Sequence, residues 1–231
     1  MPRLTGSARK DMANLTQLRM LENLDGFLLV DKPAGIAFPT VVKAVKRSFN
    51  LVKVGHGGSL DVMASGLMVL LINDANKFVD RVMGADRSYT GTLRLGYATD
   101  TGDVHGRPVP PPATVPPLAE FRGDVFQTEP RFCAIRRECS ADYEVVDTGE
   151  HAPFLAHVYR LELDGNAFSL TASKGLIVRA LAQDMGHSLE TLRRTAIGKF
   201  DVKDAIPFDQ LLKTDIKDFA SCVMPLGKAL L

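Results

Sequence analysis

The sequence predicts an α+β fold in which helices flank a mixed, largely antiparallel sheet. Apolar or alternating segments of strand length recur along the chain, amphipathic helical patterns interrupt them, and turn-forming residues join neighbouring segments. The 231 residues, 45% of them hydrophobic, are enough to bury a sizeable core. No internal repeat is visible, which argues against a solenoid or a propeller.

The first predicted elements are a buried strand and a basic amphipathic helix. Residues 26–30 (GFLLV) form an apolar run that ends in the turn-forming residues 31–35. Pro39 suits the first turn of a helix, because the N–H that proline lacks would be unpaired there anyway. The apolar face of this helix carries Val41, Val42, Val45 and Phe49. The opposite face carries Lys43, Lys46 and Arg47.

A glycine-rich segment separates this helix from the next strand. Residues 55–61 (GHGGSLD) hold three glycines in four positions, which favours a loop over a regular element. Residues 67–72 are apolar throughout and predict a buried strand. We expect residues 73–83 to form a helix capped by its first polar residues, and the alternation over residues 89–95 predicts a further strand.

The second half of the chain combines an extended connection with more strands. Six prolines in residues 106–117 exclude a helix or a central strand and predict a surface connection. Residues 141–147, 154–163 and 166–173 are predicted strands, the last two joined by a hairpin-type turn. A helix is expected after Gly175.

The composition narrows the class of protein. The longest clean apolar run, residues 67–72, is far below the roughly 18 residues that span a bilayer. The first residues lack a signal-like apolar stretch, so we expect a cytoplasmic protein that does not contact a membrane. Three cysteines, an odd number without a CxxC pair, suit a reducing compartment and provide no zinc framework. We therefore expect no metal.

The basic residues are clustered although the net charge is only +1. Residues 32–60 carry five Lys or Arg without Asp or Glu, and residues 171–200 carry five against two acidic side chains. If the two segments shared one face, they would form a surface for nucleic acid. Charge alone leaves ordinary solvated faces as the commoner interpretation.

Several catalytic signatures are absent. There is no GxxxxGK[ST], GxGxxG, GxSxG or HExxH motif, so nucleotide hydrolysis and simple metalloprotease chemistry lose support. Residues 100–102 and 147–149 each spell D-T-G, the sequence that brings two carboxylates together in aspartic proteases. A separation of 47 residues is too short for two lobes, so we interpret both as turns.

Two charged residues stand out because their neighbours are apolar. Asp61 ends the glycine-rich loop, a place where an aspartate is usually a turn former or a helix cap. The glycines beside it allow close backbone approach, so its carboxylate can be presented to a ligand. Arg179 lies on a mostly apolar helical face, where an unpaired guanidinium would be costly, and we expect it to have an anionic partner.

Taken together, spaced blocks of the sequence resemble the TruB-type pseudouridine synthases. The four matching blocks are residues 26–35 (GFLLVDKPAG), 55–66 (GHGGSLDVMASG), 86–106 (DRSYTGTLRLGYATDTGDVHG) and 174–200, which contains KGLIVRALAQDMG and LRRTAIGKF. A weaker block, residues 121–136, resembles the family's F-x-G, Q-x-P-P and S-A-x-K segment. The resemblance implies a pseudouridine synthase-like catalytic domain that isomerises the T-loop uridine (position 55) of tRNA.

The resemblance also implies roles for individual residues. It makes Asp61 the catalytic aspartate, Tyr89 the side chain that stacks on the target base, and Arg179 the partner of the aspartate. The base must be flipped out of its stack before the glycosidic bond can be broken and remade through carbon. Asp61 acts on the sugar either as a nucleophile or as a base, and both roles need the charged form. The rearrangement has no redox change, so no cofactor is expected.

Further matches and departures concern the surroundings of this site. His56 matches a histidine implied to help hold the flipped RNA, and Lys32 and Pro33 match a turn that supports the site structurally. The departures are Gly57 for Thr, Val62 for Pro, Ala37 and Phe38 for a Thr/Ser-Ser pair, and Ile177 for Tyr. The stretch between Gly186 and Leu192 is also shorter than is typical.

We expect three parts in the chain: an extension over residues 1–25, a catalytic domain over residues 26–200, and a tail over residues 201–231 without a full PUA domain. The expected partner is the T arm of tRNA, and the expected state is a monomer. A non-catalytic protein of the same fold that binds or folds RNA is the main alternative. A guide-RNA-dependent synthase is a weaker one, suggested by the G-H-G-G sequence.

Overall fold

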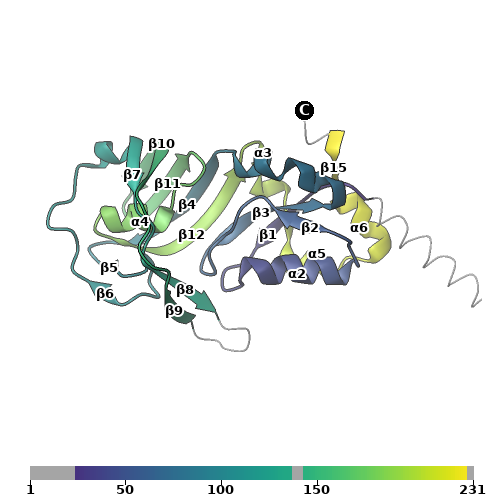
Figure 1. The fold of residues 1–231 in the computed structure, drawn as a ribbon, viewed down its shortest axis with the longest axis horizontal. Coiled ribbons are helices and arrows are strands. Elements are labelled where there is room, and N and C mark those ends of the chain that lie inside the picture. Colours follow the sequence, from purple (N-terminus) through teal and green to yellow (C-terminus); the bar gives the residue numbers. More distant parts are fainter. Residues whose placement is uncertain (1–23, 137–142, 228–231) are drawn as a thin grey trace, which may run out of the picture.

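One continuous sheet runs along the length of the molecule in the computed structural model, which describes residues 24–136 and 143–227 (Figure 1). Its main path is β14 (Ile206–Pro207), β1 (Gly26–Lys32), β3 (Ser65–Ile72), β12 (Ser188–Ile197), β4 (Arg87–Arg94), β11 (Ala167–Ala172), β10 (Phe154–Asp164) and β7 (Gly123–Gln127). Three short strands pair beside it: β2 (Val54–His56) with β3, β13 (Phe200–Asp201) with β12, and β15 (Met224–Pro225) with β1.

The strand directions confirm the predicted fold class. The β1–β14 and β3–β12 pairs are parallel, whereas the remaining pairs of this sheet are antiparallel. Two small antiparallel pairs lie outside the sheet: β5 (Ala98–Thr99) with β6 (Pro108–Val109), and β8 (Phe132–Arg136) with β9 (Tyr143–Asp147). The proline-rich residues between β6 and the next helix are exposed, as predicted for a surface connection.

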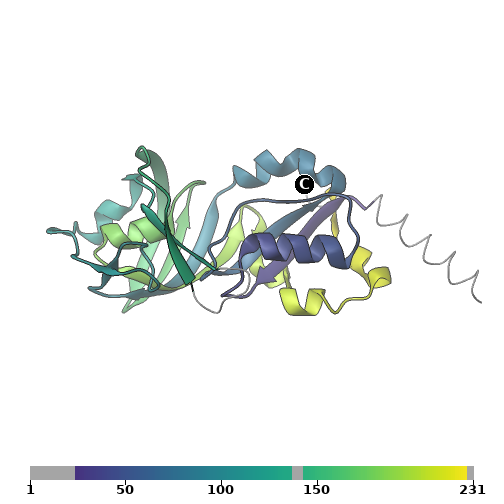
Figure 2. The same cartoon turned by 60° about the horizontal axis from the view of Figure 1, so that its bottom comes forward.

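Helices cover both faces of the sheet around β1 and β3 (Figure 2). One face carries α2 (Phe38–Ser48), α5 (Phe208–Leu211) and α6 (Ile216–Cys222), and the other carries the 3₁₀ helix η1 (Asn73–Phe78) followed by α3 (Val79–Met83). Successive side chains of a strand point to opposite faces, so both faces of β3 must be apolar to be buried here. This explains why residues 67–72 are hydrophobic without alternation.

The other half of the sheet is covered by α4 (Val178–Asp184), which packs into the same core as α2. Two further 3₁₀ helices are η2 (Leu118–Phe121) and η3 (Val202–Asp204). None of the helices in the described part of the chain is long and apolar enough to cross a membrane.

Two local predictions were wrong. Residues 55–61 were expected to lack regular structure, yet Gly55 and His56 belong to β2 and pair with Leu71 and Leu70 of β3. The glycine in this strand lets the side chain of Asn76 lie close to the backbone, because a Cβ on Gly55 would collide with it. The helix predicted over residues 73–83 is split into η1 and α3, and no side chain caps it, since the carbonyl of the Asn73 side chain accepts from the Lys53 N–H instead.

The division of the chain into parts stays a prediction. Most of the expected extension, residues 1–23, lies outside the described residues. After residue 200 the chain stays on the sheet: β14 and β15 both pair with β1. Phe219 is fully buried and its ring stacks on that of Phe49, the residue after α2, at a centroid distance of 3.8 Å. The described part of the tail therefore belongs to the core that supports β1.

Candidate active site

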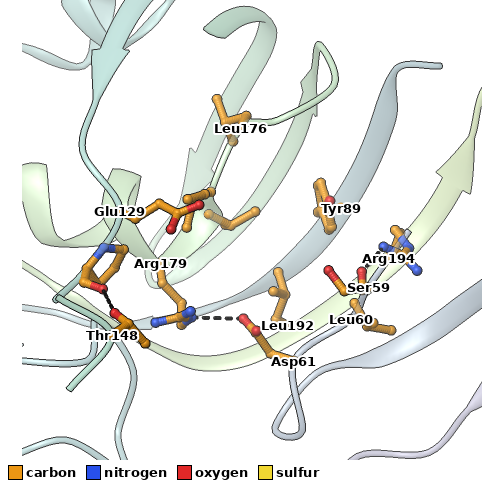
Figure 3. Close-up of a pocket in the computed structure, with 13 residues that line it drawn as sticks. Ser59, Leu60, Asp61, Tyr89, Glu129, Thr148, Leu176, Arg179, Leu192 and Arg194 are labelled. Carbon is orange, nitrogen blue, oxygen red and sulfur yellow. Dashed lines mark hydrogen bonds and ion pairs between the residues drawn. The ribbon is translucent and has the colours of Figure 1, made fainter. Parts of the chain in front are cut away.

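A cavity of about 280 Å³ opens between the two halves of the sheet, where the Asp61 loop faces β4, β12 and the start of α4 (Figure 3). The loop contributes Ser59, Leu60 and Asp61; the strands contribute Tyr89, Leu192 and Arg194; the segment into α4 contributes Leu176, Ile177, Val178 and Arg179. Glu129, Pro130 and Thr148, which flank the β8–β9 pair, complete the lining. The cavity thus combines an apolar wall with several charged groups.

Asp61 and Arg179 form an ion pair at the edge of this cavity. The Arg179 Nε donates to Asp61 Oδ2 at 2.8 Å, and the Arg179 Nη1 donates to the backbone carbonyl of Thr101 at 2.7 Å. The side chain of Arg179 is 10% exposed and that of Asp61 is 37% exposed. The guanidinium is therefore held in the protein, while the carboxylate keeps access to the cavity.

Two backbone contacts place Arg179 in the first turn of α4. The Gln127 side chain of β7 accepts from the Ile177 N–H at 2.9 Å and donates to the Ile177 carbonyl at 3.2 Å. Gly102 packs so closely on Arg179 that a Cβ there would collide with the Arg179 backbone. Residues 101 and 102 belong to one of the D-T-G sequences, so this turn serves to support the arginine.

Tyr89 lies in the middle of β4 and is almost completely buried. Its Cα is paired with Leu170 of β11 on one side and with Arg194 of β12 on the other. Figure 3 shows its side chain across the cavity from Glu129 and Arg179. A flat ring in this wall is suited to stack on a base that enters the cavity.

Lys32 ends β1 and Pro33 follows it, and neither lines the cavity. The Lys32 Nζ is fully buried and donates to the carbonyls of Pro33 at 3.0 Å, Ile36 at 2.8 Å and Val62 at 3.4 Å. Burial lowers the pKa of Lys32 to about 8, although the nearby Asp61 carboxylate opposes this fall. The ammonium thus connects the turn after β1 to Val62, the residue that follows Asp61.

His56 is the last residue of β2, directly before the loop that leads to Asp61, and is not among the residues that line the cavity. Its ring packs edge-on against Phe38 of α2 at 4.9 Å between centroids, and its Nδ1 accepts from the Gly58 N–H at 3.4 Å. Burial lowers the pKa of His56. The structure therefore brings Asp61, Tyr89 and Arg179 together in one cavity and places His56 beside their loop.

Residues 46–164 match the family model described as "TruB family pseudouridylate synthase (N terminal domain)". The chain belongs to this family. Among curated relatives, "tRNA pseudouridine synthase B" of Opitutus terrae is 35% identical over 230 residues, covering 90% of this chain and 95% of the relative. The protein of the same name from Methylobacillus flagellatus is 36% identical over 214 residues, covering 84% of this chain and 71% of the relative.

The fold of this TruB-family chain is also similar to that of solved structures. A chain in "Crystal Structure of a Cbf5-Nop10-Gar1 Complex" superposes with a TM-score of 0.62 at 23% identity, covering 92% of this chain and 63% of that one. A chain in a structure of an H/ACA RNP bound to a substrate RNA with 2'-deoxyuridine gives a TM-score of 0.61 at 22% identity, with 92% and 62% covered. At this identity the match shows the pseudouridine synthase fold alone.

Arg194 lines the cavity but was not predicted to do so from the sequence, where it counted only as part of a basic segment. Its neighbour Arg193 forms a two-pronged ion pair with Asp31 of β1, with N–O distances of 3.0 and 2.6 Å. Neighbouring strand residues point to opposite faces, so one arginine of the pair had to point inward. This alternation was the signal available in the sequence. Ser59, Glu129, Thr148, Leu176 and Leu192 were also not predicted to line the site.

Proposed function

We propose that this TruB-family enzyme converts the T-loop uridine at position 55 of tRNA to pseudouridine. The observation that carries the proposal is the Asp61–Arg179 pair at the edge of a cavity walled by Tyr89. The curated relatives named above are tRNA pseudouridine synthases, which supports tRNA as the substrate class. A charged carboxylate beside a stacking ring is what an aspartate-dependent rearrangement of a flipped base needs.

The proposed reaction begins when the target base leaves its stack and enters the cavity. Stacking on Tyr89 offsets the few kcal/mol that base flipping costs. Asp61 then acts on the ribose, as a nucleophile at its C1' or as a base on the sugar, and the N1–C1' bond breaks. Arg179 orients the carboxylate and supplies a countercharge in either role, because its Nε donates to Asp61 Oδ2 at 2.8 Å.

The second half of the reaction rejoins the same atoms. The detached uracil turns so that its C5 faces the C1' of the sugar, and a C1'–C5 bond forms. The proton on C5 is lost and N1 gains one, so substrate and product are isomers. Every step uses groups of the RNA and of this chain, and the apolar wall formed by Leu176 and Leu192 would limit hydrolysis of the open intermediate.

The experiment uses the purified full chain and an unmodified tRNA transcript, with pseudouridine mapped at single-nucleotide resolution. A matched transcript with cytidine at position 55 serves as the control. We expect one pseudouridine at position 55 and none in the control. Pseudouridine at another position, or its absence in a transcript that the protein binds, would contradict the proposal; the second outcome is what the non-catalytic RNA-binding alternative predicts.

A further inference from the structure

Arg194 is a buried cation in the wall of the cavity. It belongs to β12, its residue exposure is 1%, and it still contributes to the cavity lining. Burial lowers the pKa of its guanidinium, while Tyr89 and the Asp61 carboxylate oppose this fall. A charge in such a place is costly unless its hydrogen bonds are well made.

The hydrogen bonds of Arg194 join the Asp61 loop to the sheet. Its Nε donates to the carbonyl of Leu67 in β3 at 2.8 Å. Its Nη1 donates to the carbonyl of Ser59 at 2.7 Å, the contact drawn in Figure 3, and its Nη2 donates to the carbonyl of Gly58 at 3.4 Å. The guanidinium of Arg194 therefore connects a central strand, β3, to Gly58 and Ser59 of the Asp61 loop.

The backbone around Arg194 is built for this contact. Arg194 is paired in parallel with Gly66, whose φ is +107°, and a Cβ on Gly66 would collide with the Arg194 backbone. On its other side, Arg194 is paired with Tyr89 of β4. The same residue thus lies between the loop that carries the aspartate and the strand that carries the stacking ring.

We propose that Arg194 is a positioning residue for the reaction, which fixes the Gly58–Ser59 backbone so that Asp61 faces Tyr89 and Arg179 at a constant distance. The inference rests on the proposed function, because the distance matters only if Asp61 performs the chemistry. Arginine suits this task better than lysine, since its rigid fork donates in several fixed directions at once. Displacement of a catalytic group by about 1 Å can reduce a rate on the order of 100-fold.

The test compares Arg194→Lys and Arg194→Met with the wild type and with Arg122→Met. Arg122 is the control because its guanidinium, like that of Arg194, donates to a backbone carbonyl, with two hydrogen bonds to that of Leu161, outside the cavity. Two quantities are measured for each protein: the single-turnover rate and Kd on tRNA, and the hydrogen exchange of backbone amides in a peptide spanning residues 57–64. Melting temperatures identify variants that fail to fold.

We expect Arg194→Lys to fold, to bind tRNA within about threefold of the wild type, and to react roughly 10- to 100-fold more slowly. Its 57–64 peptide should exchange faster while peptides from β10 and β11 remain unchanged. Arg194→Met should be slower still, and Arg122→Met should match the wild type in rate and loop exchange. Such a loss of rate without loss of binding is not the result of global destabilisation.

Unchanged exchange of the 57–64 peptide in Arg194→Lys would overturn the positioning role, whatever the rate. A rate within threefold of the wild type would overturn it as well, even with faster exchange. Because the exchange measurement needs no turnover, it distinguishes this inference from the proposed function. If the wild type forms no pseudouridine, the proposed function is wrong and Arg194 has no role in that reaction. The hydrogen exchange of the 57–64 peptide still decides whether Arg194 holds the loop.

Discussion

The side chains of Asp61 and Arg179 meet at 2.8 Å although 118 residues separate them in the chain. The two partners differ in exposure: the guanidinium is buried against the Thr101 carbonyl, and the carboxylate is more than a third exposed. The pair is therefore anchored on the arginine side and open on the aspartate side. Such an arrangement orients the carboxylate beside a countercharge without closing off the face that must meet a substrate.

Loss of Arg179 should inactivate Asp61. In a variant that already lacks the Asp61 carboxylate, loss of Arg179 should cause no further decrease in rate. We expect Arg179→Ala to reduce the single-turnover rate at least about 100-fold, because the carboxylate loses both its orientation and its countercharge. Arg179→Lys should recover only part of the rate, since an ammonium cannot bond the carboxylate and the Thr101 carbonyl in the same geometry.

The double variant Asp61→Asn with Arg179→Ala provides the check on this coupling. It should be no less active than Asp61→Asn alone, because the two residues act as one unit. Rates for the four proteins, measured on the same tRNA transcript, form a double-mutant cycle. Losses that simply add in log rate would mean that the two side chains work independently.

Some elements of the fold and site could be predicted from the sequence alone, and others could not. Strand β3 and helix α2 were predictable from the sequence. A face that is buried needs apolar residues, so β3, buried on both faces, is apolar throughout, and α2, buried on one face, is amphipathic. Strand β2 was not predictable, since its pairing with β3 outweighs the poor strand propensity of Gly55. Pairing of Asp61 with Arg179 was implied only by the family resemblance, because no local pattern reports a contact across 118 residues.

The buried Lys32 predicts a specific pH dependence of stability. Its pKa is about 8 in the folded protein and 10.5 as the ordinary value, so the unfolded chain binds more protons between these two pH values. The contribution of Lys32 to the free energy of unfolding therefore rises with pH over that window, by about 3 kcal/mol in total at 1.36 kcal/mol per pKa unit.

Urea unfolding of the wild type and of Lys32→Met, at pH 7.5 and at pH 10, measures this contribution, because the other titrating groups largely cancel in the difference. We expect the stability of the wild type relative to Lys32→Met to increase between the two pH values. A difference that is constant, or that shrinks toward pH 10, would show that the Lys32 ammonium is not penalised by burial.

Gly66 should be far less tolerant of a side chain than another glycine with positive φ. Gly66 (φ +107°) lies against the Arg194 backbone, whereas a Cβ on Gly96 (φ +65°) would meet nothing within 4 Å. We expect Gly96→Ala to cost about 1 kcal/mol from backbone strain alone, and Gly66→Ala to cost several kcal/mol or prevent folding. Equal melting temperatures for the two variants would argue against close packing of β3 on β12.

Tyr89 should contribute to RNA binding through its ring and not through its hydroxyl group. Tyr89→Ala is expected to raise the Kd for tRNA about 10- to 100-fold, the loss of roughly 1 to 3 kcal/mol of base stacking, and Tyr89→Phe to leave it nearly unchanged. Tyr159→Ala is the control, because this exposed tyrosine of β10 lies outside the cavity. The stacking role fails if Tyr89→Ala and Tyr159→Ala bind tRNA equally well.

The central claim is that the carboxylate of Asp61 performs the chemistry, and the single-turnover rate of Asp61→Asn on unmodified tRNA tests it most directly. The control is Asp31→Asn, which removes another carboxylate that pairs with an arginine, Arg193, but lies outside the cavity. We predict that Asp61→Asn loses nearly all of its single-turnover rate and binds tRNA within about tenfold of the wild type, because the amide keeps the shape and loses the charge. A rate for Asp61→Asn within tenfold of the wild type would contradict the account.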